Sequence, residues 1–158
     1  MRVRALGYVG GLALVPALWW LDGRKGPFPM TADLAVSIPL LIDAAGNSLG
    51  IYDSAHLDDV VHFFNTAALS SLVGAAVSDH VDSRATAAGV AVAFGIFGEL
   101  AWEAMEYAAE AVGFDGLDLS AVDTIGDILS ASAGAVVAGI VTWKRWRPGR
   151  GRLSAPFR

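Results

Sequence analysis

Ionisable side chains recur at helical spacing inside segments of this sequence that are otherwise apolar. They form three groups: Asp58, Asp59 and His62; Glu99, Glu103, Glu106 and Glu110; and Asp123 with Asp127. Placing a charge inside a bilayer is costly, so ionisable residues in spanning segments usually serve a function. Clustered carboxylates repel one another, and a bound cation relieves that repulsion. The three groups therefore point to a cation site or to a proton path.

The residue types favour a divalent metal ion, with zinc, manganese and iron as the candidates, because imidazole nitrogen and carboxylate oxygen are ligands for these metals. The candidate metal ligands are His62, Glu103, Glu106, Asp127 and Asp59. The candidate catalytic residues are Glu99, Glu103 and Asp127. Either Asp58 or Asp59 would orient His62 through a hydrogen bond. A metal held there would activate water, as a hydrolase or transferase requires.

Two other interpretations of the same residues remain open. A proton relay would use the acids and His62 as a stepwise path, which needs polar groups that continue across the membrane. The other half of each span offers only hydroxyl groups, such as those of Ser70 and Thr142, so a localised site ranks above a relay. In the third interpretation, the acids form a structural hydrogen-bonded network between helices.

The elements that position these residues are those of a membrane protein. The chain has 158 residues, of which 54% are hydrophobic, and a mean hydropathy of +0.51. We expect an all-α fold, a polytopic transmembrane helix bundle of four or five helices. The candidate spans are residues 3–21, 33–51, 58–77, 85–111 and 122–143. The second contains Pro39, Asp43 and Asn47, so a kinked or re-entrant segment is the alternative to a fifth span. Asp43 and Asn47 would also reach the site if this segment spans.

Charge and composition limit the function classes. Basic residues crowd the C-terminal end, which predicts a single transmembrane domain at residues 1–147 and a basic cytoplasmic tail at residues 148–158. Because this tail directly follows a span, nucleic-acid binding has little support. The absence of cysteine excludes a disulfide framework, a zinc–thiolate site and a thiol nucleophile. Arginine outnumbers lysine among abundant alanine, valine and glycine, which suggests a bacterial plasma membrane protein.

Orientation brings the three groups to one depth. With the C-terminus in the cytoplasm, the last three spans run inward, outward and inward again. At 1.5 Å per residue, Glu99 then lies about 21 Å from the cytoplasmic end of a core roughly 30 Å thick, and Glu103 about 27 Å. His62 and Asp127 lie about 6 Å below the outer boundary. We therefore expect one site near the outer face. Basic-residue counts do not decide between four spans and five.

Three blocks of sequence resemble a known family. The stretch GNSLGIYD at 46–53 followed by DVVHFF at 59–64, the stretch ELAWEAMEY at 99–107, and the stretch DTIGDIL at 123–129 are similar to the YjdF-type small bacterial membrane proteins. A weaker similarity, in the order of Asp-x-x-His, Glu and Asp, extends to VanZ-like proteins. The resemblance supports the choice of site residues and implies no particular reaction.

The sequence thus predicts an integral membrane protein with an outward-facing carboxylate and histidine site. Our hypothesis is a metal-dependent membrane enzyme that acts on a lipid-linked or envelope substrate. The alternative is a non-catalytic ion-binding or transport-associated protein. The expected partners are the lipid bilayer and a lipid-linked substrate, with a homo-oligomer or a partner subunit in addition.

Overall fold

The computed structural model describes residues 2–21, 23–24, 26–51, 57–113 and 119–145. These residues form five α-helices: α1 (Arg2–Leu21), α2 (Met30–Leu49), α3 (Leu57–Ser78), α4 (Arg84–Ala111) and α5 (Ala121–Arg145). The described part of the chain contains no strand, so the expected all-α helix bundle is confirmed. Each of the five predicted segments corresponds to one helix. The predicted tail at 148–158 lies outside the described residues.

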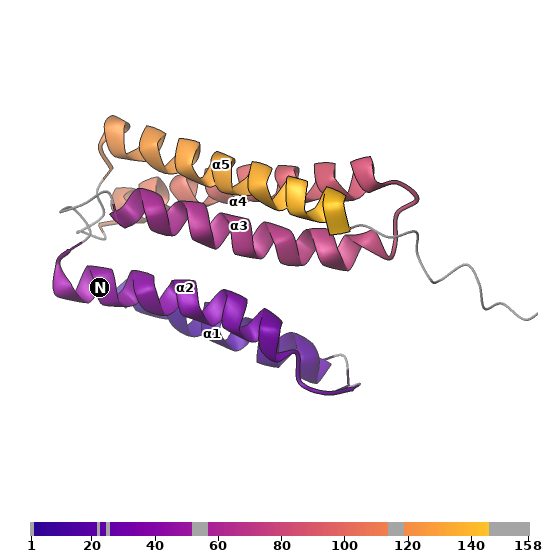
Figure 1. Ribbon diagram of the computed structural model, residues 1–158. Helices are drawn as coiled ribbons and strands as arrows, with labels where there is room; N and C mark the ends of the chain where they lie inside the picture. The colour runs from indigo at the N-terminus through magenta and orange to yellow at the C-terminus, as the bar shows by residue number, and fades with distance from the viewer. Residues whose placement is uncertain (1, 22, 25, 52–56, 114–118, 146–158) are drawn as a thin grey trace, which may run out of the picture.

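The helices divide into a hairpin and a bundle (Figure 1). Helices α3, α4 and α5 pack against one another, each against both of the others. Helices α1 and α2 lie side by side and reach the bundle through contacts between α2 and α3. Successive helices run in opposite directions. The hairpin therefore flanks the bundle, and among the described residues α1 does not pack against α4 or α5.

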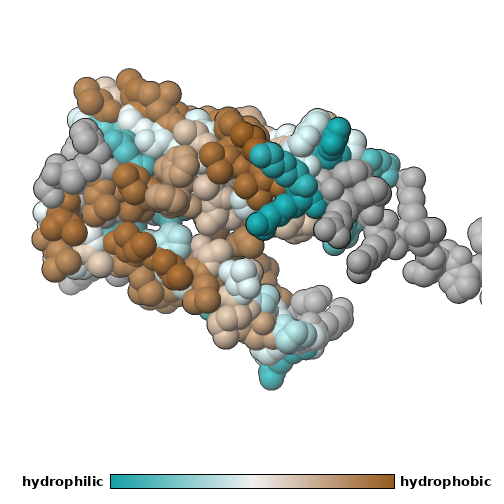
Figure 2. Space-filling view, viewed as in Figure 1, coloured by the Kyte–Doolittle hydropathy of each residue, from teal (hydrophilic) through white to brown (hydrophobic). Residues whose placement is uncertain are grey.

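The bundle has the dimensions and the surface of a membrane-embedded unit. Among the described residues, α3, α4 and α5 are long and apolar enough to cross a membrane, and α1 contributes a shorter apolar stretch, Tyr8–Leu21. Large apolar side chains face outward, with Phe97 71% exposed and Leu129 64% exposed. Figure 2 shows apolar residues over much of the visible surface of both the bundle and the hairpin. An apolar exterior around polar residues is the arrangement that a bilayer favours.

Small residues set the spacing of the bundle helices. A Cβ atom added at Gly134 of α5 would collide with the backbone carbonyl oxygen of Phe63 in α3. A Cβ atom added at Gly95 of α4 would collide with the side chains of Ser70 and Ala135. Small residues let membrane helices approach closely, where dispersion contacts replace the hydrophobic effect as the driving force. This close approach brings side chains from three helices within reach of one another.

The two ends of the bundle differ in charge. At one end lie Asp58, Glu110 and Asp123, where α3 and α5 begin and α4 ends. At the other end Arg84 opens α4, and the last turn of α5 contains two basic residues. The Arg84 guanidinium stacks over the Trp143 ring, 4.5 Å from its centroid, which ties these two helix ends together. The acidic end is the one near which the candidate site residues lie.

The packing of α3 on α5 generates a stability prediction. Gly134→Ala should lower the free energy of unfolding by about 1–3 kcal/mol, because the added methyl group forces the two backbones apart. The matched control is Gly89→Ala in α4, where a Cβ atom meets nothing within 4 Å. Thermal unfolding in detergent micelles measures both variants. Equal unfolding temperatures for the two would contradict the packing account.

Candidate functional site

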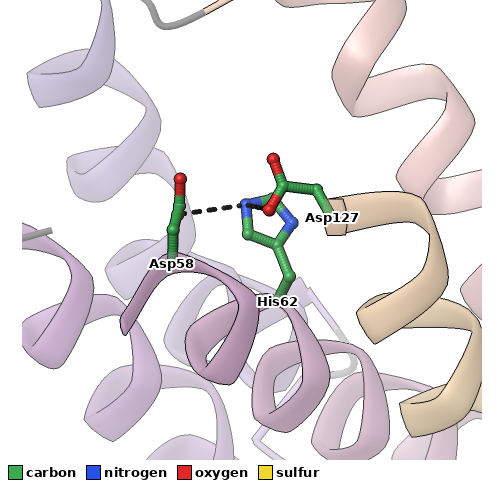
Figure 3. Close-up of side chains that lie close together, drawn as sticks. All are labelled: Asp58, His62 and Asp127. Carbon is green, nitrogen blue, oxygen red and sulfur yellow. Dashed lines mark ion pairs between the residues drawn. The ribbon is translucent and has the colours of Figure 1, made fainter. Parts of the chain in front are cut away.

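His62 lies at the centre of a group of carboxylates contributed by three helices. Its Nδ1 is 2.6 Å from Oε1 of Glu99 on α4. Its Nε2 is 3.4 Å from Oδ1 of Asp58, one turn earlier on α3, and 3.8 Å from Oδ1 of Asp127 on α5. Figure 3 shows the imidazole ring between Asp58 and Asp127. Both ring nitrogens of His62 thus face carboxylate oxygens.

Three of the carboxylates are buried. Glu99 is 8% exposed, Glu103 5% and Asp127 4%. Glu99 and Glu103 are four residues apart on α4, so helical periodicity places both on the face that packs into the bundle. Within the described part of the chain, Glu99 and Asp127 form ion pairs with His62, and neither pairs with a lysine or arginine. The site is therefore rich in negative charge, which a bound cation would balance.

Glu103 has an oxygen that the protein does not satisfy. Its Oε1 is buried and has no hydrogen-bond partner among the described residues. Leaving a buried acceptor unpaired costs about 1–3 kcal/mol, and more for a charged group. Native structures rarely contain such atoms without a water, an ion or a catalytic role to explain them. The unpaired oxygen therefore marks a place where a further group belongs.

Two sets of side chains present their ligand atoms close together. Asp58, His62 and Asp127 form the first set, and His62, Glu99 and Glu103 the second, with all ligand atoms of a set within 4.8 Å of one another. Zinc–ligand bonds of about 2.0–2.2 Å at tetrahedral angles separate neighbouring ligand atoms by about 3.4 Å. The separations from His62 Nε2 to Asp58 and Asp127 are 3.4 and 3.8 Å. They are long for hydrogen bonds and suit two atoms that share an ion.

The structure separates the two neighbouring aspartates of α3. Asp58 shares a helix face with His62, four residues on, and contacts its Nε2. Asp59 instead accepts a hydrogen bond from the Ser130 hydroxyl at 3.3 Å and lies beside Gly126 of α5. Asp59, one of the candidate ligands, thus belongs to neither ligand set. Asp58, which the sequence predicts only as an orienting group, lies with a carboxylate oxygen 3.4 Å from Nε2 of His62.

A cavity of about 290 Å³ adjoins this group, between the α1–α2 hairpin and the bundle. His62, Glu99 and Asp127 lie in its wall, together with the candidate ligand Glu106. Glu106 belongs to neither ligand set. Figure 2 shows the molecule hollowed between the hairpin and the bundle. The site is therefore open to a ligand rather than sealed inside the bundle.

The hairpin also contributes residues to the cavity. Asp43 of α2 lines it, as expected if the second segment runs alongside the others. Tyr8 of α1 lines it as well, and sequence reasoning missed this residue. A single tyrosine in an apolar helix carries no periodic signal. Its place in the cavity wall depends on how α1 packs against α2, which the sequence does not show.

A model of one protein family matches residues 3–147, a range that covers all five helices. That family is described as a predicted membrane protein, DUF2238. The chain belongs to this family. The expected membership of a family of small membrane proteins is thereby confirmed.

Comparison of this DUF2238 protein with curated proteins finds no match, and comparison with solved structures finds none. Membership establishes that the chain is a membrane protein and assigns no reaction to it. The function must therefore be argued from the side chains themselves.

The contact between Glu99 and His62 generates a second prediction. Glu99→Ala should lower the free energy of unfolding by about 1–3 kcal/mol, because it leaves a part-buried imidazole without its closest partner. Glu110→Ala, on the exposed end of the same helix, is the control and should stay within about 0.5 kcal/mol of the parent protein. Reversible unfolding in mixed micelles provides the measurement.

A double-mutant cycle sharpens this test. Combining Glu99→Ala with His62→Ala should cost clearly less than the sum of the two single changes, because the second change removes the group that the first left unpaired. Strict additivity would show that the two side chains act independently, contrary to the geometry.

Proposed function

We propose that this DUF2238 protein is a metal-dependent membrane enzyme that acts on a lipid-linked or envelope substrate near the outer face of a bacterial plasma membrane. A single divalent ion would be held by Nε2 of His62 and by the carboxylates of Asp58 and Asp127. The observation that carries the proposal is the spacing of these three ligand atoms around a part-buried imidazole. Zinc, manganese and iron all accept such a ligand set.

Glu99 would prepare His62 for this role. An ionised Glu99 accepts a hydrogen bond from Nδ1–H, which leaves the lone pair of Nε2 directed at the metal position. Metal-binding histidines commonly donate their second N–H to a carboxylate, which fixes the ring and strengthens its basicity. The 2.6 Å contact supports this assignment. Glu99 is thus a positioning residue in the proposed site.

The charge balance supports a divalent ion. Two carboxylates and a neutral imidazole neutralise an ion of charge +2, which reduces the cost of placing acids at membrane depth. Three protein ligands leave coordination positions open to substrate or water, as in catalytic rather than structural zinc sites. In this proposal the burial of Asp127 is compensated by the ion together with His62.

The remaining acids would serve the reaction. A bound metal supplies polarisation of a substrate oxygen and activation of water at neutral pH. Glu103, whose buried Oε1 has no hydrogen-bond partner among the described residues, would be the general base. Glu106 lines the cavity beyond it and would contact the substrate.

A non-catalytic ion-binding or transport role is the second candidate. The hydroxyls of Ser70 and Thr142 are buried without a hydrogen-bond partner among the described residues, and they lie farther from the acidic end than His62. They would suit an ion or water path, but the described spans add no carboxylate at that depth. A localised metal site therefore remains the better-supported function.

Metal content tests the proposal. The purified protein should carry about one divalent ion per chain, and Asp58→Asn should lose most of it, because the ligand oxygen is replaced by a weakly binding amide. Asp59→Asn is the matched control, because the carboxylate of Asp59 lies next to that of Asp58 in sequence but accepts a hydrogen bond from Ser130. Elemental analysis after dialysis measures both. Absence of stoichiometric metal from the parent protein, or equal loss in both variants, would refute the assignment.

Orientation is tested separately, because the natural chain has no cysteine. Val112 is 73% exposed at the acidic end, and Asp79 is exposed in the loop between α3 and α4 at the basic end. The positive-inside rule predicts that Val112→Cys reacts with a membrane-impermeant maleimide in intact cells, or in spheroplasts where an outer membrane is present. Asp79→Cys should react only after lysis. The reverse pattern would place the site on the cytoplasmic side.

A further inference from the structure

The lining of the cavity is negatively charged at one end. The carboxylates in its wall are Asp43, Asp58, Glu99, Glu106, Asp123 and Asp127. The described lining contains no lysine or arginine. A bound metal ion would neutralise two of these acids, and His62 partly compensates a third. The cavity keeps an excess of negative charge in either state, so it repels anionic groups and attracts cations.

The other end of the cavity is apolar. Leu14 of α1, Val36 and Leu40 of α2 and Leu69 of α3 form much of this part. From Asp58 to Leu69 the wall of α3 extends about 16 Å along the helix axis. On α1, α2, α3 and α4 the charged or aromatic lining residues lie toward the acidic end of the bundle, and toward the other end the lining is apolar apart from Asn65, Thr66 and Ser70 of α3. The cavity is therefore amphipathic, with its polar end at the acidic end of the bundle.

Aromatic side chains accompany the acids. Trp102 lines the cavity one turn before Glu106 on α4, and Tyr8 lines it from α1 near the start of the hairpin. Electron-rich ring faces attract ammonium groups, and the attraction is strongest where water is excluded. Carboxylates and aromatic rings together form the type of pocket that binds alkylammonium ions.

The loose attachment of the hairpin gives this cavity a route to the bilayer. Helix α2 packs on α3, whereas α1 does not pack on α4 within the described residues. Residues of both α1 and α4 nevertheless line the cavity. No packing of α1 on α4 closes this side of the cavity among the described residues, which would let a molecule with a hydrocarbon chain enter from within the membrane.

We propose that the substrate or ligand of this cavity is a membrane amphiphile with an ammonium headgroup. The headgroup lies among Asp43, Glu106 and Trp102, and the hydrocarbon chain lies along the leucines of α1, α2 and α3. This inference rests on the proposed function, since it names the substrate class of the same site. It also predicts discrimination, because an amphiphile with a purely anionic headgroup meets the same carboxylates and is repelled.

Binding of radiolabelled dodecyltrimethylammonium to the protein in maltoside micelles tests this inference. A quaternary ammonium has no lone pair and cannot bind a metal, so binding of this probe does not depend on metal ligation. We expect saturable binding of about one molecule per chain. Unlabelled dodecyltrimethylammonium should compete at least about tenfold better than dodecyl phosphate, a difference of about 1.4 kcal/mol.

Two glycines of α4 provide matched variants. A Cβ atom at Gly98 or at Gly89 meets nothing within 4 Å, but only Gly98 lines the cavity. Gly98→Leu should fill the cavity and weaken binding at least about tenfold, whereas Gly89→Leu should leave it unchanged. Glu106→Gln, which keeps the shape and removes one charge, should weaken binding without lowering the unfolding temperature.

The outcomes separate this inference from the metal proposal. Equal or better competition by dodecyl phosphate, or equal binding by the two leucine variants, would overturn the ammonium assignment even if the protein holds its metal. If the purified protein carries no stoichiometric metal but still binds the ammonium probe, the result supports the ammonium assignment and refutes the metal proposal. The ammonium assignment and the metal proposal can therefore fail separately.

Discussion

The burial of carboxylates around His62 is the constraint on which the rest of the structure depends. A charge at membrane depth is tolerated only where it meets a partner. Glu99 and Asp127 meet theirs in one imidazole ring, at 2.6 and 3.8 Å. Such distances require α3, α4 and α5 to pack closely, and Gly95 and Gly134 permit that approach. The small residues of the bundle and the polar residues of the site are therefore two parts of one arrangement.

Much of this arrangement could be predicted from the sequence, because helix rise and periodicity are fixed by the backbone. The segment expected at 58–77 is α3, Leu57–Ser78, and the depth estimate correctly brought His62, Glu99 and Asp127 together. The choice between Asp58 and Asp59 could not be made, since both lie within one turn of His62. That choice depends on the rotation of α3 against α5, which the contact of Asp59 with Ser130 reveals.

The cavity was beyond sequence reasoning for a related reason. Among the described residues the hairpin packs on the bundle only through α2 and α3, and this leaves space between the hairpin and the bundle. No local sequence pattern encodes that tertiary packing. Its consequence is functional: the same carboxylates that would hold a metal form the polar end of an amphipathic chamber. In the proposed function, Asp58 and Asp127 would bind the ion, and Asp43 and Glu106 at the same polar end of the cavity would select the headgroup beside it.

In the proposed metal site, His62 would bind the ion through Nε2 while Asp58 and Asp127 complete the ligand set. X-ray absorption spectroscopy of the purified, zinc-loaded protein tests it most directly. The account predicts one imidazole nitrogen together with carboxylate oxygens at about 2.0–2.2 Å, and loss of the imidazole signal in His62→Ala. A first shell of oxygen alone, unchanged by that substitution, would contradict it.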